Sequence, residues 1–237
     1  VKMLKKGLSG VLSDKEINEV YSAFDIIGDI VIIKIPETMK DKKELIGESI
    51  ISNVKPVRTV LMQSSPVQGD FRVRGVEYIA GENKTTTIYK EHNCKFKVDV
   101  SKVYFSPRLS TERDRIANLV NDDEVIVNMF AGIGTFSVVI AKKHRCKIYN
   151  IDINPDAYYL CNENIKLNKI NECIIPILGD AKEVIEKKLK NKADRVLMPL
   201  PEKAAEYLEH AIMSTKNRGI IHYFTHVHSN SKKESMK

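Results

Sequence analysis

The chain has 237 residues, an apolar share of 43% and a formal net charge of +7. This length accommodates one large domain or two domains of ordinary size, and no stretch predicts a membrane-spanning helix or a secretory signal. The basic charge is compatible with a nucleic-acid partner and equally with an ordinary lysine-rich surface. The four cysteines lie far apart without a CxxC pair, which argues against a metal site and favours reduced thiols in a cytoplasmic protein.

Residues 1–107 are expected to form a small α+β domain with mostly antiparallel strands. The segment 24–35 predicts a hairpin, because Gly28 and Asp29 stand between two β-branched runs. The segment 41–54 has helical spacing. The apolar side of this helix is expected to consist of Leu45, Ile46, Ile50 and Ile51. Further strands are predicted at 59–62, 85–89 and 94–100.

From Thr111 onward the predicted helices and strands alternate, which is typical of an α/β domain with a mostly parallel sheet. Asn154 is expected to cap a helix from Pro155 to Asn168. The strands of this domain are predicted at 124–127, 147–151, 173–178, 195–198 and 219–225. Its other helices are predicted at 135–143, 181–190 and 203–213.

The most informative segment is the strand at 124–127 with the glycine turn that follows it. Gly132 and Gly134 allow the backbone to approach a ligand closely, and Asp152 ends the next strand, 20 positions after Gly132. An acid at this place accepts hydrogen bonds from both hydroxyls of a ribose. Because only two glycines are present, we expect S-adenosylmethionine rather than a dinucleotide. The alternative is a glycine-bearing turn in another doubly wound sheet.

Polar and turn residues gather at the predicted carboxyl ends of the strands, where ligands bind in such sheets. They are residues 128–134, Asp152, Asp180 and residues 199–201. In adenosylmethionine-binding folds, a carboxylate at the place of Asp180 accepts a hydrogen bond from the adenine amine. Asp180 also suits a helix N-cap, and the two roles are compatible.

The fourth strand is followed by Pro199, Leu200 and Pro201. Methyltransferases that act on amino groups carry Asp or Asn here, then two prolines and an aromatic residue. This chain has neither the polar residue nor the aromatic one, which argues against an exocyclic amine as the target. The alternative interpretation is a proline-rich turn that closes the strand.

A carboxylate among arginines, with aromatic rings beside it, lies just before the α/β domain. Glu112 follows the ring pair Tyr104 and Phe105. Such a group suits a purine turned out of its stack, because it offers a stacking surface, a donor to O6 and a base for N1. Alternatively, Thr111 and Asp114 make a capping box and Glu112 is an ordinary first-turn residue. The arginines near this carboxylate are Arg108, Arg113 and Arg115.

Together these segments resemble the archaeal and eukaryal family of tRNA guanine-37 N1-methyltransferases, over roughly residues 20–225. The matching stretches are 69–74, 80–83, 102–108, 112–113, 129–134, 152–155, 164–168 and 219–223. The resemblance implies a Rossmann-like class I methyltransferase domain at 108–237, behind a smaller α+β domain at 1–107 that contacts the tRNA. It implies a monomer in the cytoplasm, with no membrane partner.

The same resemblance implies roles for individual residues. Glu112 would be the general base at N1, Arg72 would order the site and Tyr104 would lie by the guanine. We expect a nearby arginine to stabilise charge on O6, and we count Arg108 among the catalytic residues. Asp152 would bind the ribose. The residues expected to contact S-adenosylmethionine are Phe130, Ala131, Gly132, Gly134, Asp152, Ile153, Asp180 and Pro199.

The chain departs from the family pattern at two positions. Asn128 stands where members commonly have Asp, and Pro199 replaces an Asn whose amide helps to hold the guanine. Some members carry a tRNA-elbow domain at the N-terminus and two further C-terminal strands, and we expect this chain to lack both. Two alternatives stay open. One is aminocarboxypropyl transfer from the same cofactor in the wybutosine pathway, which uses the same fold. The other is a catalytically weak tRNA-binding protein, which Pro199 and the missing C-terminal strands favour.

Overall fold

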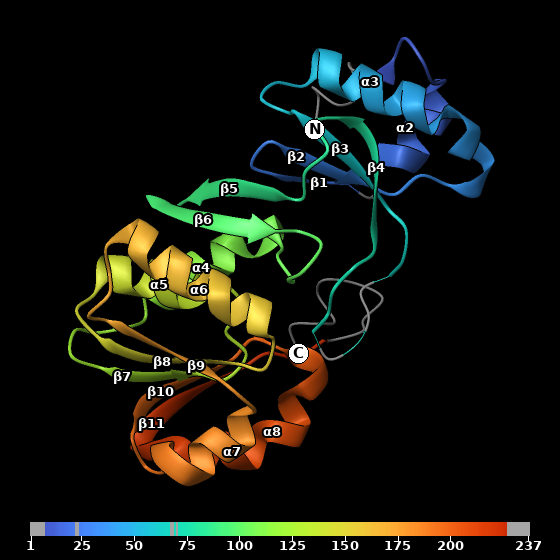
Figure 1. The fold of residues 1–237 in the computed structure, drawn as a ribbon. Coiled ribbons are helices and arrows are strands. Elements are labelled where there is room, and N and C mark those ends of the chain that lie inside the picture. Colours follow the sequence, from blue (N-terminus) through green and yellow to red (C-terminus); the bar gives the residue numbers. More distant parts are fainter. Residues whose placement is uncertain (1–7, 22–23, 67–68, 70, 227–237) are drawn as a thin grey trace. The chain divides into compact units, whose positions relative to one another are not determined.

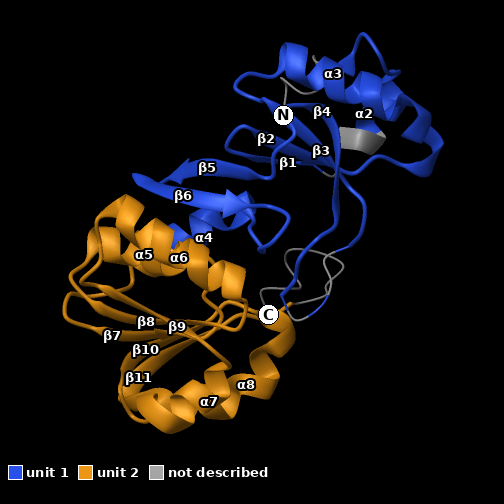
Figure 2. Ribbon diagram, viewed as in Figure 1, with its two compact units in different colours: residues 1–114 blue, residues 115–237 orange. Residues whose placement is uncertain are grey.

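The computed structural model describes residues 8–21, 24–66, 69 and 71–226. These residues divide into two compact units, residues 1–114 and residues 115–237 (Figure 2). Each unit contains a cluster of buried apolar side chains of its own.

Unit 1 contains a four-stranded sheet in the order β1-β2-β3-β4. The predicted hairpin is confirmed, because β1 and β2 pair antiparallel around the turn at Gly28 and Asp29. β2 and β3 are parallel, whereas β3 and β4 are antiparallel. The strand bounds are Phe24–Ile27 for β1, Ile30–Ile33 for β2, Thr59–Gln63 for β3 and Val76–Gly81 for β4.

The core of this sheet is completed by α2 (Asp14–Tyr21) and α3 (Lys43–Asn53), with the short helix η1 (Glu37–Lys42) before α3. The predicted helix is confirmed, but the assignment of Leu45 to its apolar side is wrong. Ile46 and Ile50 are one turn apart and fully buried, whereas Leu45 is 55% exposed. Each helical residue is rotated by about 100° from the one before it, so the neighbour of a central core position lies at the rim of the buried stripe.

The rest of unit 1 begins with a two-stranded hairpin, β5 (Thr86–Glu91) and β6 (Cys94–Asp99). The short helix η2 (Pro107–Leu109) then runs directly into α4 (Ser110–Ala117). The predicted capping box at Thr111 is therefore wrong, because Thr111 is the second residue of α4 and not its N-cap. Glu112 does lie in the first turn of this helix.

Unit 2 contains a five-stranded parallel sheet in the order β11-β10-β7-β8-β9. Two strands run outward from β7 on each side, so the order along the chain reverses between β7 and β10. α5 and α6 cover one face of the sheet, and α7 and α8 cover the other (Figure 1). This is the predicted doubly wound α/β architecture, in which ligands bind at the reversal point.

The predicted elements of unit 2 are present with small shifts at their ends. The strands are β7 Val125–Asn128, β8 Lys147–Asp152, β9 Ile174–Leu178, β10 Ala193–Met198 and β11 Thr215–Tyr223. The helices are α5 Thr135–Lys143, α6 Pro155–Asn168, α7 Ala181–Val184 with the π-helical turn η3 Ile185–Leu189, and α8 Pro201–Ser214. α6 has the predicted bounds, because the side chain of Asn154 accepts a hydrogen bond from the backbone of Asp156 and caps it.

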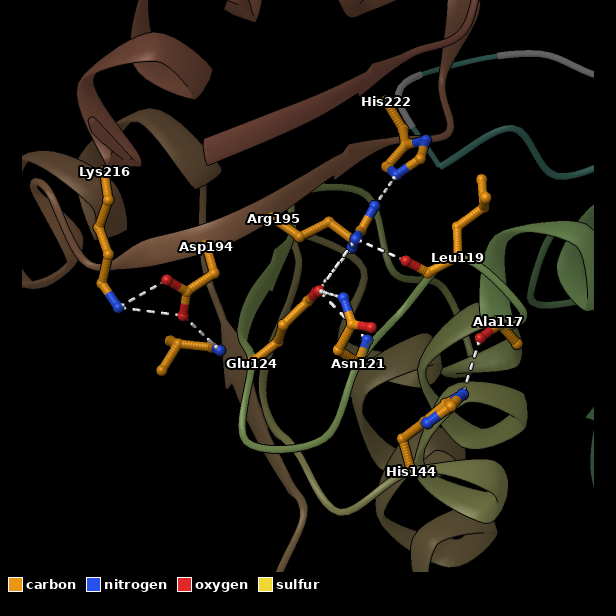
Figure 3. A network of polar contacts seen from close by, with 10 residues as sticks. Ala117, Leu119, Asn121, Glu124, His144, Asp194, Arg195, Lys216 and His222 are labelled. Atoms are coloured by element: carbon orange, nitrogen blue, oxygen red, sulfur yellow. Dashed lines mark hydrogen bonds and ion pairs between the residues drawn. The ribbon is translucent and has the colours of Figure 1, made fainter. Parts of the chain in front are cut away.

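A network of polar contacts joins the starts of the central strands (Figure 3). The buried guanidinium of Arg195 donates to both carboxylate oxygens of Glu124, at 2.7 and 3.0 Å, to the carbonyl of Leu119 and to the ring of His222. Burial raises the pKa of Glu124, but its hydrogen bonds from Arg195 and Asn121 outweigh this and leave the pKa below its usual value. This ion pair holds the edge of the sheet opposite to the carboxyl ends.

Candidate active site

The glycine turn at the carboxyl end of β7 leaves room for a ligand. Gly132 and Gly134 have φ values of 55° and 85°, a left-handed conformation that side chains with a Cβ rarely adopt. A Cβ on Gly134 would lie 3.0 Å from the sulfur of Cys161, whereas one on Gly132 would meet no atom within 4 Å. The backbone conformation therefore requires both glycines, and open space lies over Gly132.

Asp152 ties this turn to the end of β8. One carboxylate oxygen accepts the backbone N–H of Gly132 at 2.6 Å, and the other accepts that of Asn154 at 2.9 Å. Burial raises the pKa of Asp152, and the hydrogen bonds from the backbone of Asn154, Gly132 and Ile153 only partly oppose the shift. A carboxylate offers about four lone-pair positions. Three backbone N–H groups do not use all of them, so the carboxylate can still accept a hydrogen bond from a ribose hydroxyl.

Asp180 caps the next helix and also binds a tyrosine. Its Oδ1 accepts the backbone N–H of Lys182 at 2.7 Å, which confirms the N-cap. Its Oδ2 accepts the hydroxyl of Tyr207 at 2.6 Å. The ring of Tyr207 lies edge-on to Phe130, with their centroids 5.0 Å apart. The sequence contained no signal for Tyr207, which lies on α8 and is 27 positions from Asp180.

Apolar side chains are exposed at the same edge of the sheet. Ile153 and Leu178 are 48% and 49% exposed and come from the ends of the neighbouring strands β8 and β9. Their exposed surfaces suit the faces of an adenine ring. Leu178 was not predicted as a site residue. Pro199 is half-buried after β10, and no side chain caps the start of α8.

Asn128 begins a buried series of neutral polar groups. Its amide donates to Ser137, the hydroxyl of Ser137 donates to Asn150, and the amide of Asn150 donates to the sulfur of Cys161. Burial raises the pKa of the Cys161 thiol to about 12, so it stays neutral. Among the residues that the structure describes, the Oδ1 of Asn128 has no hydrogen-bond donor. An amide at this position avoids the cost of burying a carboxylate beside uncharged groups.

In unit 1 the structure brings Arg72 and Tyr104 together. The guanidinium of Arg72 lies 4.8 Å from the centroid of the Tyr104 ring. Tyr104 is 40% exposed, whereas its neighbour Phe105 is buried and packs edge-on against Tyr89. The ring pair that the sequence indicated is therefore divided: Tyr104 offers a surface to a ligand and Phe105 belongs to the core.

Arg108 is held by the carboxylate of Asp25, for which the sequence contained no signal. Its Nε donates to one oxygen of Asp25 at 3.1 Å, and its Nη2 donates to the carbonyl of Phe24. Arg74 donates to the other oxygen of Asp25, also at 3.1 Å. Asp25 thus joins Arg74 and Arg108, which come from two distant segments, to β1.

Glu112 is half-buried on α4, and its neighbour Arg113 fixes this helix. The guanidinium of Arg113 donates to both carboxylate oxygens of Glu91, at 2.5 and 2.7 Å, and to the carbonyl of Ser106. Arg113 and Glu91 are only 1% and 4% exposed. The ring of His92 also binds the hydroxyl of Ser110 at 2.9 Å. Arg113 therefore acts on the structure of the site and is not available to a substrate.

The described residues contain no group of three or more His, Cys, Asp and Glu side chains that could hold a metal ion. Within the same residues, no helix is long and apolar enough to cross a membrane. The candidate groups are the carboxyl edge of the sheet in unit 2, with Asp152 and Asp180, and a set of arginine, tyrosine and glutamate side chains in unit 1.

The doubly wound sheet, with a glycine turn tied to an acid at its reversal point, defines the class: an α/β domain of the class I methyltransferase type. Comparison with family models assigns the chain within this class. A model described as "TRM5/TYW2 methyltransferase domain" matches residues 87–236, and one described as "TYW2 N-terminal domain" matches residues 4–85. The chain belongs to the TRM5/TYW2 methyltransferase family.

Two similar proteins carry the names of different activities. The chain is 47% identical, over 86% of its length, to tRNA (guanine(37)-N(1))-methyltransferase Trm5b of Pyrococcus abyssi, of which it spans 59%. It is 42% identical, over 83% of its length, to tRNA(Phe) (4-demethylwyosine(37)-C(7)) aminocarboxypropyltransferase of Methanocaldococcus jannaschii, of which it spans 75%.

The fold has a similarly close counterpart among solved structures. A complex of aTrm5 and tRNALeu superposes with a TM-score of 0.81 at 43% sequence identity. The superposition covers 89% of this chain and 62% of that chain. This chain thus spans about three fifths of the length of both Trm5 relatives.

Proposed function

We propose that the chain transfers the methyl group of S-adenosyl-L-methionine to N1 of guanosine 37 in tRNA. The observation that carries this proposal is the contact between Arg72 and Tyr104, which joins a half-exposed ring and a cation in the unit that also holds Glu112. Such a group can stack a base and supply a donor to it. The 47% identity to a tRNA (guanine(37)-N(1))-methyltransferase supports the same reaction.

The edge of unit 2 fits S-adenosylmethionine. In our proposal Asp152 accepts the ribose hydroxyls, Asp180 faces the adenine amine, and Ile153 with Leu178 contacts the adenine faces. When bound, the cofactor supplies an electrophilic methyl group on a sulfonium. The open space over Gly132 supports a close approach of the backbone to the ligand. The other residues that we propose to contact the cofactor are Phe130, Ala131, Gly134 and Pro199.

The proposed reaction requires unit 1 to remove a proton from the guanine. N1 of guanine carries a hydrogen near neutral pH, so a base must accept it as the N1–methyl bond forms. In our proposal the carboxylate of Glu112 accepts this proton. The negative charge that develops on O6 is stabilised by Arg108, which uses only some of its N–H donors on Asp25 and Phe24. In the same proposal, Arg72 and Tyr104 position the guanine ring.

A second candidate is aminocarboxypropyl transfer to a wybutosine precursor at position 37. Two observations favour it: the match of residues 4–85 to the TYW2 N-terminal domain and the 42% identity to the aminocarboxypropyltransferase. Pro199 also favours this second candidate, because it replaces the Asn whose amide holds the guanine in family members. Glu112 next to Arg113 favours methyl transfer, because the rival reaction needs no base at N1.

Nucleoside mass analysis decides between these activities. The chain is incubated with tRNA that carries either guanosine or 4-demethylwyosine at position 37, and with cofactor labelled either in the methyl group or in the aminocarboxypropyl group. We expect label in 1-methylguanosine from the methyl-labelled cofactor alone, and none in a tRNA with adenosine at position 37. Transfer of the aminocarboxypropyl label would establish the second candidate. Cofactor and tRNA binding without either product would indicate a catalytically weak binding protein.

We further propose that residues 1–107 form the RNA-contacting part and residues 108–237 the methyltransferase part, and that the chain acts as a cytoplasmic monomer. The boundary at 107 lies between two other divisions of the chain. The family models meet between residues 85 and 87, and the compact units meet between residues 114 and 115. Separate expression of residues 108–237, followed by adenosylmethionine titration, tests this boundary.

A further inference from the structure

One face of the β5–β6 hairpin carries three lysines. Side chains alternate between the two faces of a strand, and directly paired residues share a face. The register pairs Lys90 with Lys95 and Ile88 with Lys97. This outer face therefore consists of Thr86, Ile88, Lys90, Lys95, Lys97 and Asp99. We call its lysines, Lys90, Lys95 and Lys97, the lysine face.

The charge pattern of the lysine face is unfavourable for the hairpin by itself. Lys90 and Lys95 stand directly opposite each other, and like charges in such a pair lower stability. The single acid of this face, Asp99, accepts hydrogen bonds from Ser101 and Thr86. A bound polyanion would relieve the repulsion between the lysines.

A pocket adjoins this face within unit 1. Its volume is about 810 Å³, and its lining includes Lys84, Lys90 and Lys97 together with Thr86 and Tyr89. The acid in the pocket, Asp29, is engaged by the ammonium of Lys84 at 2.7 Å and by the hydroxyl of Thr87 at 2.6 Å. The charged side chains that line the pocket are three lysines and one aspartate, so their formal charges sum to about +2 at neutral pH.

The opposite face of the hairpin packs on the candidate catalytic segment. Tyr89 contacts Phe105, and Glu91 binds Arg113 on α4. The hairpin that carries the lysine face therefore contacts the helix that carries Glu112 directly, through Glu91 and Arg113. A ligand held on the lysine face would be kept in a fixed register with Glu112.

We propose that the lysine face and its pocket bind the phosphodiester backbone of the RNA substrate, away from the base that is modified. Lysine ammonium groups bind phosphates as point charges, and such contacts fix the register of a nucleic acid on a protein. The identity of this RNA as tRNA rests on the proposed function.

The test is the salt dependence of tRNA binding by the triple variant Lys90→Gln, Lys95→Gln and Lys97→Gln. A plot of log affinity against log salt has a negative slope, and each lost phosphate contact reduces its magnitude by about 0.7–0.9. For three lost contacts we expect the magnitude to decrease by roughly 2–2.7. The affinity for adenosylmethionine should stay unchanged, and the melting temperature should not fall, because the substitutions remove the repulsion between the paired Lys90 and Lys95. The three corresponding arginine substitutions should keep the parent slope, because arginine retains the charge.

The matched control removes three charges elsewhere, with Lys187→Gln, Lys188→Gln and Lys190→Gln on the exposed surface of unit 2. Equal slopes in the parent and the lysine-face variant, or an equal decrease in the control, would overturn the proposal. If the parent chain binds tRNA with an unchanged salt dependence but does not methylate it, the result contradicts the proposed reaction. It does not contradict the proposed contact between the lysine face and the RNA backbone.

Discussion

The two units position their candidate site residues in different ways. In unit 2 the acid and the glycine turn meet because β7 and β8 are adjacent parallel strands, and the groups that follow them reach the same edge. In unit 1 the corresponding groups are joined by ion pairs between distant segments. Arg108 and Asp25 are 83 positions apart, and Arg74 and Asp25 are 49 apart.

The difference shows where each unit is sensitive to change. A parallel sheet gathers its strand ends at one edge whatever the side chains are, so the cofactor edge depends on backbone geometry and on a few local hydrogen bonds. The antiparallel hairpins of unit 1 have no such common edge. Their loops depend on particular charged partners, and the loss of one partner leaves an unpaired charge behind.

Each unit also contains one strongly buried arginine–glutamate pair, and these two pairs make the comparison testable. Arg113 and Glu91 hold the helix that carries Glu112. Arg195 binds Glu124 directly before the start of β7, whereas the glycine turn follows the other end of this strand. The same chemistry therefore supports a candidate catalytic group in unit 1 and only the sheet in unit 2.

The largest expected effect is that of Glu112→Gln on the chemical step. The amide keeps the shape of the side chain but cannot accept the N1 proton, so the single-turnover methylation rate should fall about 10²–10⁴-fold. The free energy of unfolding should change by no more than about 1 kcal/mol, the scale of a first-turn charge. Glu44→Gln is the matched control, since Glu44 lies in the first turn of α3. A rate within threefold of the parent would exclude Glu112 as the base.

The next effect compares Arg113→Met with Arg195→Met. Each change leaves a buried carboxylate without its partner and should lower the free energy of unfolding by about 3–5 kcal/mol, as measured by urea unfolding. At a temperature where both variants are folded, only Arg113→Met should lower the methylation rate. Adding Glu91→Leu to Arg113→Met should restore stability but not turnover. Equal turnover in the two single variants would contradict a positioning role for Arg113.

Asp152→Ala should weaken the binding of adenosylmethionine by about 2–4 kcal/mol, because charge-assisted hydrogen bonds contribute roughly 1.5–3 kcal/mol each and water compensates in part. Stability should also fall, since the N–H groups of Gly132 and Asn154 lose their acceptor. Calorimetry measures the loss of cofactor affinity, and a tRNA-binding assay shows whether the variant is still folded, because its tRNA affinity should not change. Asp156→Ala, in the first turn of α6, is the control, and an unchanged cofactor affinity of Asp152→Ala would reject the ribose assignment.

The smallest effect is the pH dependence of cofactor binding. Burial raises the pKa of Asp152 in the unliganded protein, and ribose hydroxyls favour its ionised form. The affinity for adenosylmethionine should therefore fall as the pH decreases through this raised pKa, by at most about tenfold per pH unit. The stability of the unliganded protein depends on pH in the opposite direction. The contribution of Asp152 to this stability is largest at low pH and is lost as the pH rises through the raised pKa. The affinity of Asp152→Asn should be independent of pH over this range, and a parallel decrease in that variant would place the titrating group elsewhere.

The sequence by itself determined much of unit 2. Gly132 and Gly134 marked the turn, Asn154 and Pro155 marked the start of α6, and Asp152 marked the end of β8. These features depend on backbone conformation, capping and periodicity within a few residues, and such local rules act wherever the segment lies in the fold. The alternation of helices and strands was enough to predict that the strand ends share an edge.

Only the tertiary structure decided the partners. It joined Tyr207 to Asp180, Asp25 to Arg108 and Glu91 to Arg113, and it exposed Leu45 while it buried Arg113. A charged or aromatic side chain has many potential partners along the chain, and which one it meets depends on how distant segments pack. Periodicity specifies the face of an element, but the centre of a buried stripe depends on the surface that covers it. For this reason the sequence identified the chemistry of the candidate site, and the packing of the chain determined which residues support it.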